Sequence, residues 1–147
     1  MKINKRDPGH WLLLLRQGAY TLLAACARYL SPRPRKPVVV LYGHQLSGNL
    51  KALYEEWQQS HSADLDCYFL SLDPQYGETL RSEGVNVLRC GSLSDMLLVG
   101  RCSAIVTDHG LHAMSLFISL TDIIFIDVWH GIPFKGFIPD DFRLQHR

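Results

Sequence analysis

The sequence predicts an α/β fold built on a parallel, doubly wound sheet. From about residue 37 to residue 130, short apolar runs alternate with stretches that have helical patterning. Strands that alternate with helices along a chain are typical of parallel sheets. The apolar runs are continuous rather than alternating with polar residues, which indicates strands buried on both faces.

The first predicted strand, residues 38–42, is the run Val-Val-Val-Leu-Tyr. After a glycine-containing loop, Ser47 or Asn49 is expected to cap a helix that continues to about residue 60. The later apolar runs predicted as strands are residues 67–72, 85–88, 103–107 and 123–128. The stretches predicted as the helices between them are residues 76–82, 95–99 and 111–120.

Charge is divided unevenly between two parts of the 147-residue chain. Residues 1–36 carry eight Lys or Arg and one Asp, a net charge of +7, whereas residues 37–147 carry −6. We therefore predict a basic amino-terminal appendage, residues 1–36, and one domain, residues 37–147. A basic segment on an acidic domain indicates an anionic surface as its partner, and the acidic domain argues against nucleic acid.

A mostly apolar stretch, residues 11–30, is predicted as a helix long enough to span a bilayer. Gln17, Thr21 and Arg28 share a narrow arc of this helix, and Arg16 lies about a quarter-turn away. A charge near the centre of a spanning helix costs about 2.5–3.5 kcal/mol. Because a helix lying in the interface avoids that cost, we predict a monotopic helix on the cytoplasmic face of an anionic membrane.

Two alternatives for this helix stay open. It could pack against a part of the protein outside this sequence, or it could span the membrane. Residues 31–37, which follow it, contain three prolines and are predicted as a stiff linker.

The four cysteines form no CxxC pair, so a structural zinc site is not expected. Cys67 and Cys102 lie in or beside predicted strands, where a thiol behaves as a small apolar side chain. We predict reduced thiols and no disulfide.

Three histidines follow predicted strands at the point where each strand ends: His44, His109 and His130. The carboxyl ends of parallel strands meet at one edge of the sheet, where ligands bind in open α/β folds. We expect the three to line one cleft and to serve acid–base chemistry. A three-histidine zinc site is a weaker alternative because no pair has helix-face spacing. Ordinary loop hydrogen bonding by each histidine is another.

Carboxylates stand close to two of these histidines. Asp108 precedes His109 and Asp127 lies three residues before His130, so either is placed to orient an imidazole. Asp108 suits equally the N-cap of the next helix. The Ser47-Gly48-Asn49 segment, which opens a predicted helix, is placed to offer backbone N–H groups to an anion.

Residues 129–135, Trp-His-Gly-Ile-Pro-Phe-Lys, resemble the WHGxPxK signature of the CDP-glycerol glycerophosphotransferase family. This family contains teichoic acid primases and polymerases and related capsule polymerases. Residues 48–54 resemble its GN-xK-x-L segment, and residues 107–109 resemble its xDH segment. The resemblance extends over about residues 37–138.

The resemblance implies the amino-terminal, Rossmann-like half of a GT-B fold, which meets a lipid-linked glycan acceptor. The carboxyl-terminal half of such enzymes holds CDP-glycerol or a related CDP-alditol. His130 corresponds to the general base on the acceptor hydroxyl, alditol phosphate is transferred and CMP leaves. No cofactor and no metal are expected, and the family's enzymes are peripheral proteins of the cytoplasmic membrane face. The residues expected to bind substrate are Lys135, Asp108, His109, His44 and Asn49.

The sequence departs from the family pattern at three points. Asp127 stands where many relatives carry Gln, and Phe134 replaces the commoner Leu. The donor-binding half is absent, so we expect a truncated or split acceptor-side half that is inactive without it. The alternatives are a non-catalytic, membrane-attached α/β binding module and half of a nucleotide-sugar glycosyltransferase.

Overall fold

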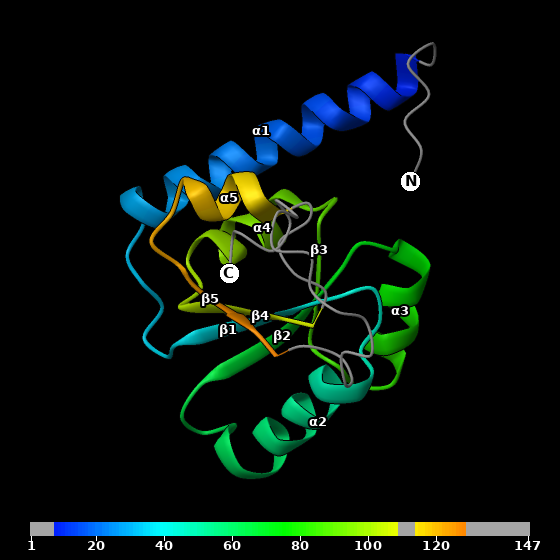
Figure 1. Ribbon diagram of the computed structural model, residues 1–147, viewed down its shortest axis with the longest axis vertical. Helices are drawn as coiled ribbons and strands as arrows, with labels where there is room; N and C mark the ends of the chain where they lie inside the picture. Colours follow the sequence, from blue (N-terminus) through cyan, green and yellow to red (C-terminus); the bar gives the residue numbers. More distant parts are fainter. Residues whose placement is uncertain (1–7, 109–113, 129–147) are drawn as a thin grey trace, which may run out of the picture.

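The computed structural model describes residues 8–108 and 114–128 and confirms the predicted α/β fold (Figure 1). Within these residues, five strands form one all-parallel sheet in the order β3-β2-β1-β4-β5. This is a Rossmann-like order, in which the chain starts in the centre of the sheet and builds outward on both sides. The strands are β1 (Val38–Tyr42), β2 (Asp66–Ser71), β3 (Val87–Arg89), β4 (Ala104–Thr107) and β5 (Ile124–Asp127).

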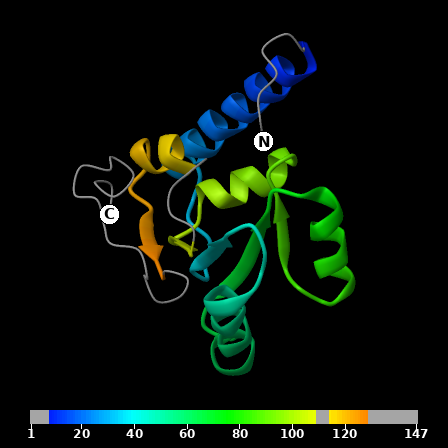
Figure 2. The same ribbon diagram turned by 45° about the vertical axis from the view of Figure 1, so that its right-hand side comes forward.

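Helices cover both faces of the sheet (Figures 1 and 2). One face carries α1, α4 and α5, and the other carries α2 and α3, each with its own apolar cluster. Because successive side chains of a strand point to opposite faces, Val40 belongs to the first cluster and Leu41 to the second. The helices are α1 (Pro8–Leu30), α2 (Gly48–Glu56), α3 (Pro74–Ser82), α4 (Leu93–Gly100) and α5 (Ser115–Ser119), with a π-helical continuation of α2, η1 (Trp57–His61).

The helix starts differ in how they are capped. Asp73 caps α3, since its Oδ1 accepts the backbone N–H groups of Gln75 and Tyr76 at 2.8 and 3.2 Å. At α2, Ser47 takes the N-cap position without a side-chain capping hydrogen bond. Ser47 is therefore the N-cap residue, one of the two that the sequence offered, but without a side-chain hydrogen bond, and the Asn49 amide donates to the Val128 carbonyl.

The expectation that the last strand is buried on both faces is wrong. β5 lies at the edge of the sheet, and Ile124 and Ile126 on one of its faces are 61% and 43% exposed. On the other face, Phe125 packs on the cluster that α1, α4 and α5 share with the sheet. A continuous apolar run predicts a strand, but the position of the strand in the sheet decides how much of it is covered.

The carboxyl-terminal part of α1 packs on its own domain, against α4 and α5. Ala24, Ala25 and Ala27 are buried there, and the two helices approach so closely that a Cβ at Gly100 would collide with the Ala24 carbonyl. The Arg28 guanidinium donates to the Cys102 carbonyl at 2.7 Å and to Asp122.

The polar stripe of α1 therefore faces the domain. Thr21 Oγ1 donates to the Gln17 carbonyl at 2.9 Å, and the Gln17 side chain bonds the Cys90 thiol. No helix in the part of the chain that the structure describes has the length and apolarity needed to cross a membrane.

Candidate functional site

The carboxyl ends of three neighbouring strands meet at one edge of the sheet. Tyr42 of β1 is in register with Thr107 of β4, and Thr107 with Asp127 of β5. The loops that follow these strands therefore begin side by side, as predicted. His44 lies exposed in the loop after β1, and Asp108 follows β4 directly.

Val128, the residue before the Trp129-His130-Gly131 segment, is held at this edge from two sides. Its N–H donates to the Thr107 carbonyl at 2.8 Å, and its own carbonyl accepts a hydrogen bond from the Asn49 amide at 3.2 Å. The backbone that leads into the signature is thus tied to β4 and to the first turn of α2. The sequence predicted Asn49 as a substrate contact, and that role stays a prediction. The hydrogen bond from Asn49 to Val128 was not predicted.

Gly43 lets the loop after β1 approach the buried Asp108 carboxylate. A Cβ at position 43 would lie 3.0 Å from Asp108 Oδ1 and 2.7 Å from Leu50 Cδ1, closer than ordinary packing allows. Asp108 is 5% exposed and Thr107 is fully buried. Sequence reasoning did not select Gly43 as a site residue, although a glycine directly after a buried strand was the available signal.

The other predicted site residues, His109, His130 and Lys135, lie outside the described residues. Whether the three strand-end histidines line one cleft stays a prediction. Within residues 8–108 and 114–128, no three His, Cys, Asp or Glu side chains gather closely enough to hold a metal ion.

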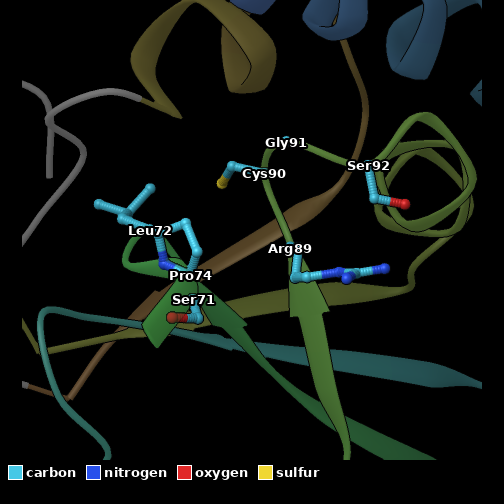
Figure 3. A pocket seen from close by; sticks show the side chains of 7 residues that line it. All are labelled: Ser71, Leu72, Pro74, Arg89, Cys90, Gly91 and Ser92. Atoms are coloured by element: carbon cyan, nitrogen blue, oxygen red, sulfur yellow. The ribbon is translucent and has the colours of Figure 1, made fainter. Parts of the chain in front are cut away.

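A cavity of about 310 Å³ opens at the same sheet edge, beside the ends of β2 and β3 (Figure 3). Arg89, one of its lining residues, pairs with Asp95 at 3.5 Å and with Glu78 at 3.6 Å. These carboxylates offset its positive charge, so the cavity offers little attraction to an anion. The lining residues are Ser71, Leu72, Pro74, Arg89, Cys90, Gly91 and Ser92.

Cys90, which lines this cavity, is not suited to nucleophilic catalysis. Burial raises the pKa of its thiol to about 11, and the hydrogen bond with Gln17 only partly opposes that rise. Since the thiolate is the nucleophile, a thiol protonated at neutral pH is nearly inert.

Comparison with known protein families shows to which family this chain belongs. The sequence model of the CDP-glycerol:poly(glycerophosphate) glycerophosphotransferases matches residues 27–143. The chain belongs to this family. No curated protein and no solved structure matches the chain significantly.

Membership confirms the resemblance carried by residues 129–135. The matched range starts near the end of α1, includes β1 to β5 and extends past the Trp129-His130-Gly131 segment. A CDP-glycerol glycerophosphotransferase-like function follows at the level of the family, with a CDP-glycerol-type nucleotide donor and a glycan acceptor. The double tie on Val128 therefore lies directly before the family signature.

Proposed function

We propose that this domain is the acceptor side of a CDP-glycerol glycerophosphotransferase that extends a lipid-linked glycan in teichoic acid or capsule-like polymer synthesis. Its proposed place of action is the cytoplasmic face of the cell membrane, where nucleotide-activated donors meet lipid-linked acceptors.

In the proposed reaction, His130 takes the proton of the acceptor hydroxyl. The hydroxyl oxygen then attacks the β-phosphorus of the CDP-alditol, the bond from that phosphorus to the bridging oxygen breaks, and CMP leaves with the electron pair. His130 returns its proton to solvent. Imidazole suits this role because it titrates near neutral pH.

The observation that carries this proposal is the double tie on Val128. Phosphoryl transfer depends mainly on positioning and on stabilisation of charge. The hydrogen bonds to Thr107 and Asn49 fix the backbone of Val128, which lies two residues before the proposed base in the sequence. The tie therefore supports a role for the segment that needs its backbone held in place.

The proposal gives the neighbouring residues binding roles. His44, exposed at the same edge, and Asp108, buried beside Gly43, are proposed to contact the acceptor side of the substrates. His109 is assigned to the same group from its place in the sequence. Lys135 is proposed to place positive charge on the phosphates.

The test measures CMP release from CDP-glycerol with a lipid-linked glycan acceptor. The chain is assayed alone and mixed with the donor-binding half of a family member, and a nucleotide sugar serves as control donor. His130→Ala is expected to abolish transfer in whichever arm is active. Undiminished transfer by His130→Ala would contradict the base assignment, and absence of transfer in every arm would contradict the proposed function.

A matched pair of variants tests the positioning role of Asn49. The side-chain amides of Asn49 and Asn86 both donate to a backbone carbonyl, at 3.2 Å to Val128 and at 3.3 Å to Cys67. Each alanine variant is expected to lose about 0.5–1.5 kcal/mol of stability. Only Asn49→Ala is expected to lower kcat, by about tenfold to a hundredfold, because small misplacements of a catalytic group are costly. Equal kcat in the two variants would refute the positioning role.

A further inference from the structure

His44 lies in the segment between β1 and α2, residues 43–47, which we call the β1–α2 loop. Residues 43–46 belong to no helix or strand, and the His44 and Gln45 side chains are exposed. Ordering a loop costs conformational entropy, so a loop keeps one conformation only where contacts with the rest of the domain hold it. The contacts that hold this loop therefore decide where the His44 side chain lies.

The β1–α2 loop is held at both ends. At its start, Gly43 lies so close to the Asp108 carboxylate and to the first turn of α2 that an added Cβ would displace its neighbours. At its other end, the backbone N–H of Leu46 donates to the hydroxyl oxygen of Tyr76 at 3.0 Å. The Leu46 side chain is buried in the apolar cluster that α2 and α3 cover. His44 lies between these two points.

Tyr76, which supplies the acceptor oxygen, is itself fixed in α3, beside the loop (Figure 1). Its backbone N–H donates to the capping carboxylate of Asp73 at 3.2 Å, and its ring packs edge-on against Phe69 of β2, with the ring centroids 6.2 Å apart. The next residue, Gly77, lets α3 approach β2, because a Cβ there would lie 3.3 Å from Ser71. The hydroxyl of Tyr76 is therefore a fixed point to which the loop is bound.

The hydrogen bond from Leu46 to Tyr76 joins residues that are 30 positions apart, and neither α3 nor the sheet depends on it. Asp73 caps α3, and the strands pair through their own backbone hydrogen bonds. The helix α2 is also held independently, since Leu50 and Tyr54 are buried against the sheet. The effect of this hydrogen bond therefore falls on the β1–α2 loop.

We propose that Tyr76 is a positioning residue, which holds the β1–α2 loop in the conformation that presents His44 to the acceptor. The proposal rests on the proposed function, because His44 is assigned there to the acceptor side of the substrates. Tyr76 acts through the loop and not by touching the substrate. Loss of its hydroxyl is therefore expected to weaken acceptor binding, whereas the hydrogen bond from Asn49 to Val128 stays intact.

Two tyrosines offer a matched pair of variants. The Tyr54 hydroxyl also accepts a backbone N–H, that of Asn86 at 2.9 Å, and its ring also packs on an aromatic neighbour, Trp57. Asn86 directly precedes β3 and so lies at the amino edge of the sheet, away from the candidate site. Tyr76→Phe and Tyr54→Phe each remove one hydroxyl and keep the ring, so both are expected to lower the urea midpoint of unfolding by similar amounts.

The first measurement needs no transferase activity. Backbone order parameters from NMR relaxation report motion on the picosecond-to-nanosecond timescale, with about 0.85 for rigid backbone and below about 0.6 for flexible backbone. In Tyr76→Phe, the order parameters of residues 44–46 are expected to fall from the rigid toward the flexible range. In Tyr54→Phe, they are expected to stay at the values of the parent chain.

The second measurement uses the CMP-release assay in whichever arm is active. Tyr76→Phe is expected to raise the KM for the lipid-linked glycan by about threefold to tenfold, and to leave kcat and the KM for CDP-glycerol within about twofold. Tyr54→Phe is expected to leave all three unchanged. Because Tyr76 acts through His44, adding Tyr76→Phe to His44→Ala should raise the acceptor KM no further than His44→Ala alone.

Four results would overturn the role of Tyr76. The first is an unchanged set of order parameters in Tyr76→Phe, and the second is an unchanged acceptor KM in an active Tyr76→Phe enzyme. The third is a further rise in that KM when Tyr76→Phe is added to His44→Ala. The fourth is an equal rise from Tyr54→Phe, because general destabilisation would then explain the effect.

These four results leave the proposed transferase function standing. Absence of transfer in every arm would instead contradict that function, and with it the acceptor role of His44. The order parameters decide even then whether the Tyr76 hydroxyl holds the loop.

Discussion

Replacing Gly100 with alanine tests the packing of α1 on α4. The added Cβ would fall on the carbonyl oxygen of Ala24 and lie 2.8 Å from its carbonyl carbon and 3.0 Å from its Cα. These are backbone atoms of a helix, so rotation of a side chain cannot relieve the collision. The two helices must separate, or α1 must leave the domain.

The expected cost follows from what holds α1 in place. Overpacking of a closely packed site costs about 1–3 kcal/mol. Full release of the helix would expose the methyl groups of Ala24, Ala25 and Ala27, at about 0.8 kcal/mol each. It would also break the Arg28 hydrogen bond to Cys102, at about 1.5–3 kcal/mol. Separation of the helices costs less than full release, and because the collision is with backbone atoms we take the upper end of the overpacking range, about 3 kcal/mol. After a gain of about 0.5–1 kcal/mol from replacing a helical glycine, we expect a net loss of about 2–2.5 kcal/mol.

Urea unfolding followed by circular dichroism measures this loss, with Gly18→Ala as the matched control. Gly18 lies in α1, and a Cβ there would meet nothing within 4 Å. The control is expected to gain about 0.5–1 kcal/mol from helix propensity alone. If Gly100→Ala stays within about 0.5 kcal/mol of the parent chain, a difference typical of surface substitutions, the packing argument is refuted.

Three further predictions address the charges, thiols and loop contacts. The hydrogen bond from Arg28 lowers the pKa of Asp122 from 3.8, so the stability that Asp122→Asn removes should be constant above about pH 5 and shrink as pH falls below about 4. If the free energy of unfolding changes with pH in the same way for the parent chain and for Asp122→Asn, the prediction is wrong. Maleimide should modify Cys26 first under native conditions, because Cys26 is exposed and the other three thiols are buried. Burial raises the pKa of Cys67 and of Cys102 to about 12 and that of Cys90 to about 11. Equal labelling of all four thiols in the folded chain would contradict their burial. Gly43→Ala should cost about 1–3 kcal/mol in urea unfolding through its contacts with Leu50 and Asp108, and an unchanged midpoint would show that the loop is free to move.

The strands and their parallel arrangement were predictable because each depends on a local pattern. The run Val38–Tyr42 has only apolar side chains on both faces, which a buried parallel strand requires. The positions of His44 and Asp108 at one edge follow from the same reasoning, since each lies within two residues of the end of a strand of a parallel sheet. The signature at residues 129–135 was readable for the same reason, because it is a short local motif.

The facing of α1 was not predictable from its own periodicity. A helical wheel of α1 shows a narrow polar stripe and a wide apolar face, and this pattern alone predicts that the polar stripe faces water. The structure turns the stripe inward because Arg28 finds Asp122, 94 residues away, and because Gly100 leaves room for Ala24. Helical period defines which residues share a face, but the partner of that face comes from elsewhere in the chain.

The sequence by itself determined the five-strand pattern, the strand-end positions of the candidate residues and the family signature. Only the tertiary structure decided that β5 lies at the sheet edge with Ile124 exposed, and that the amide of Asn49 ties down Val128, 79 residues away. The physical reason is the range of the interactions. Burial of a strand or a helix requires a periodic pattern of apolar residues, which is visible in the sequence. Contacts between segments that are distant in sequence require no such pattern and form only when the chain packs.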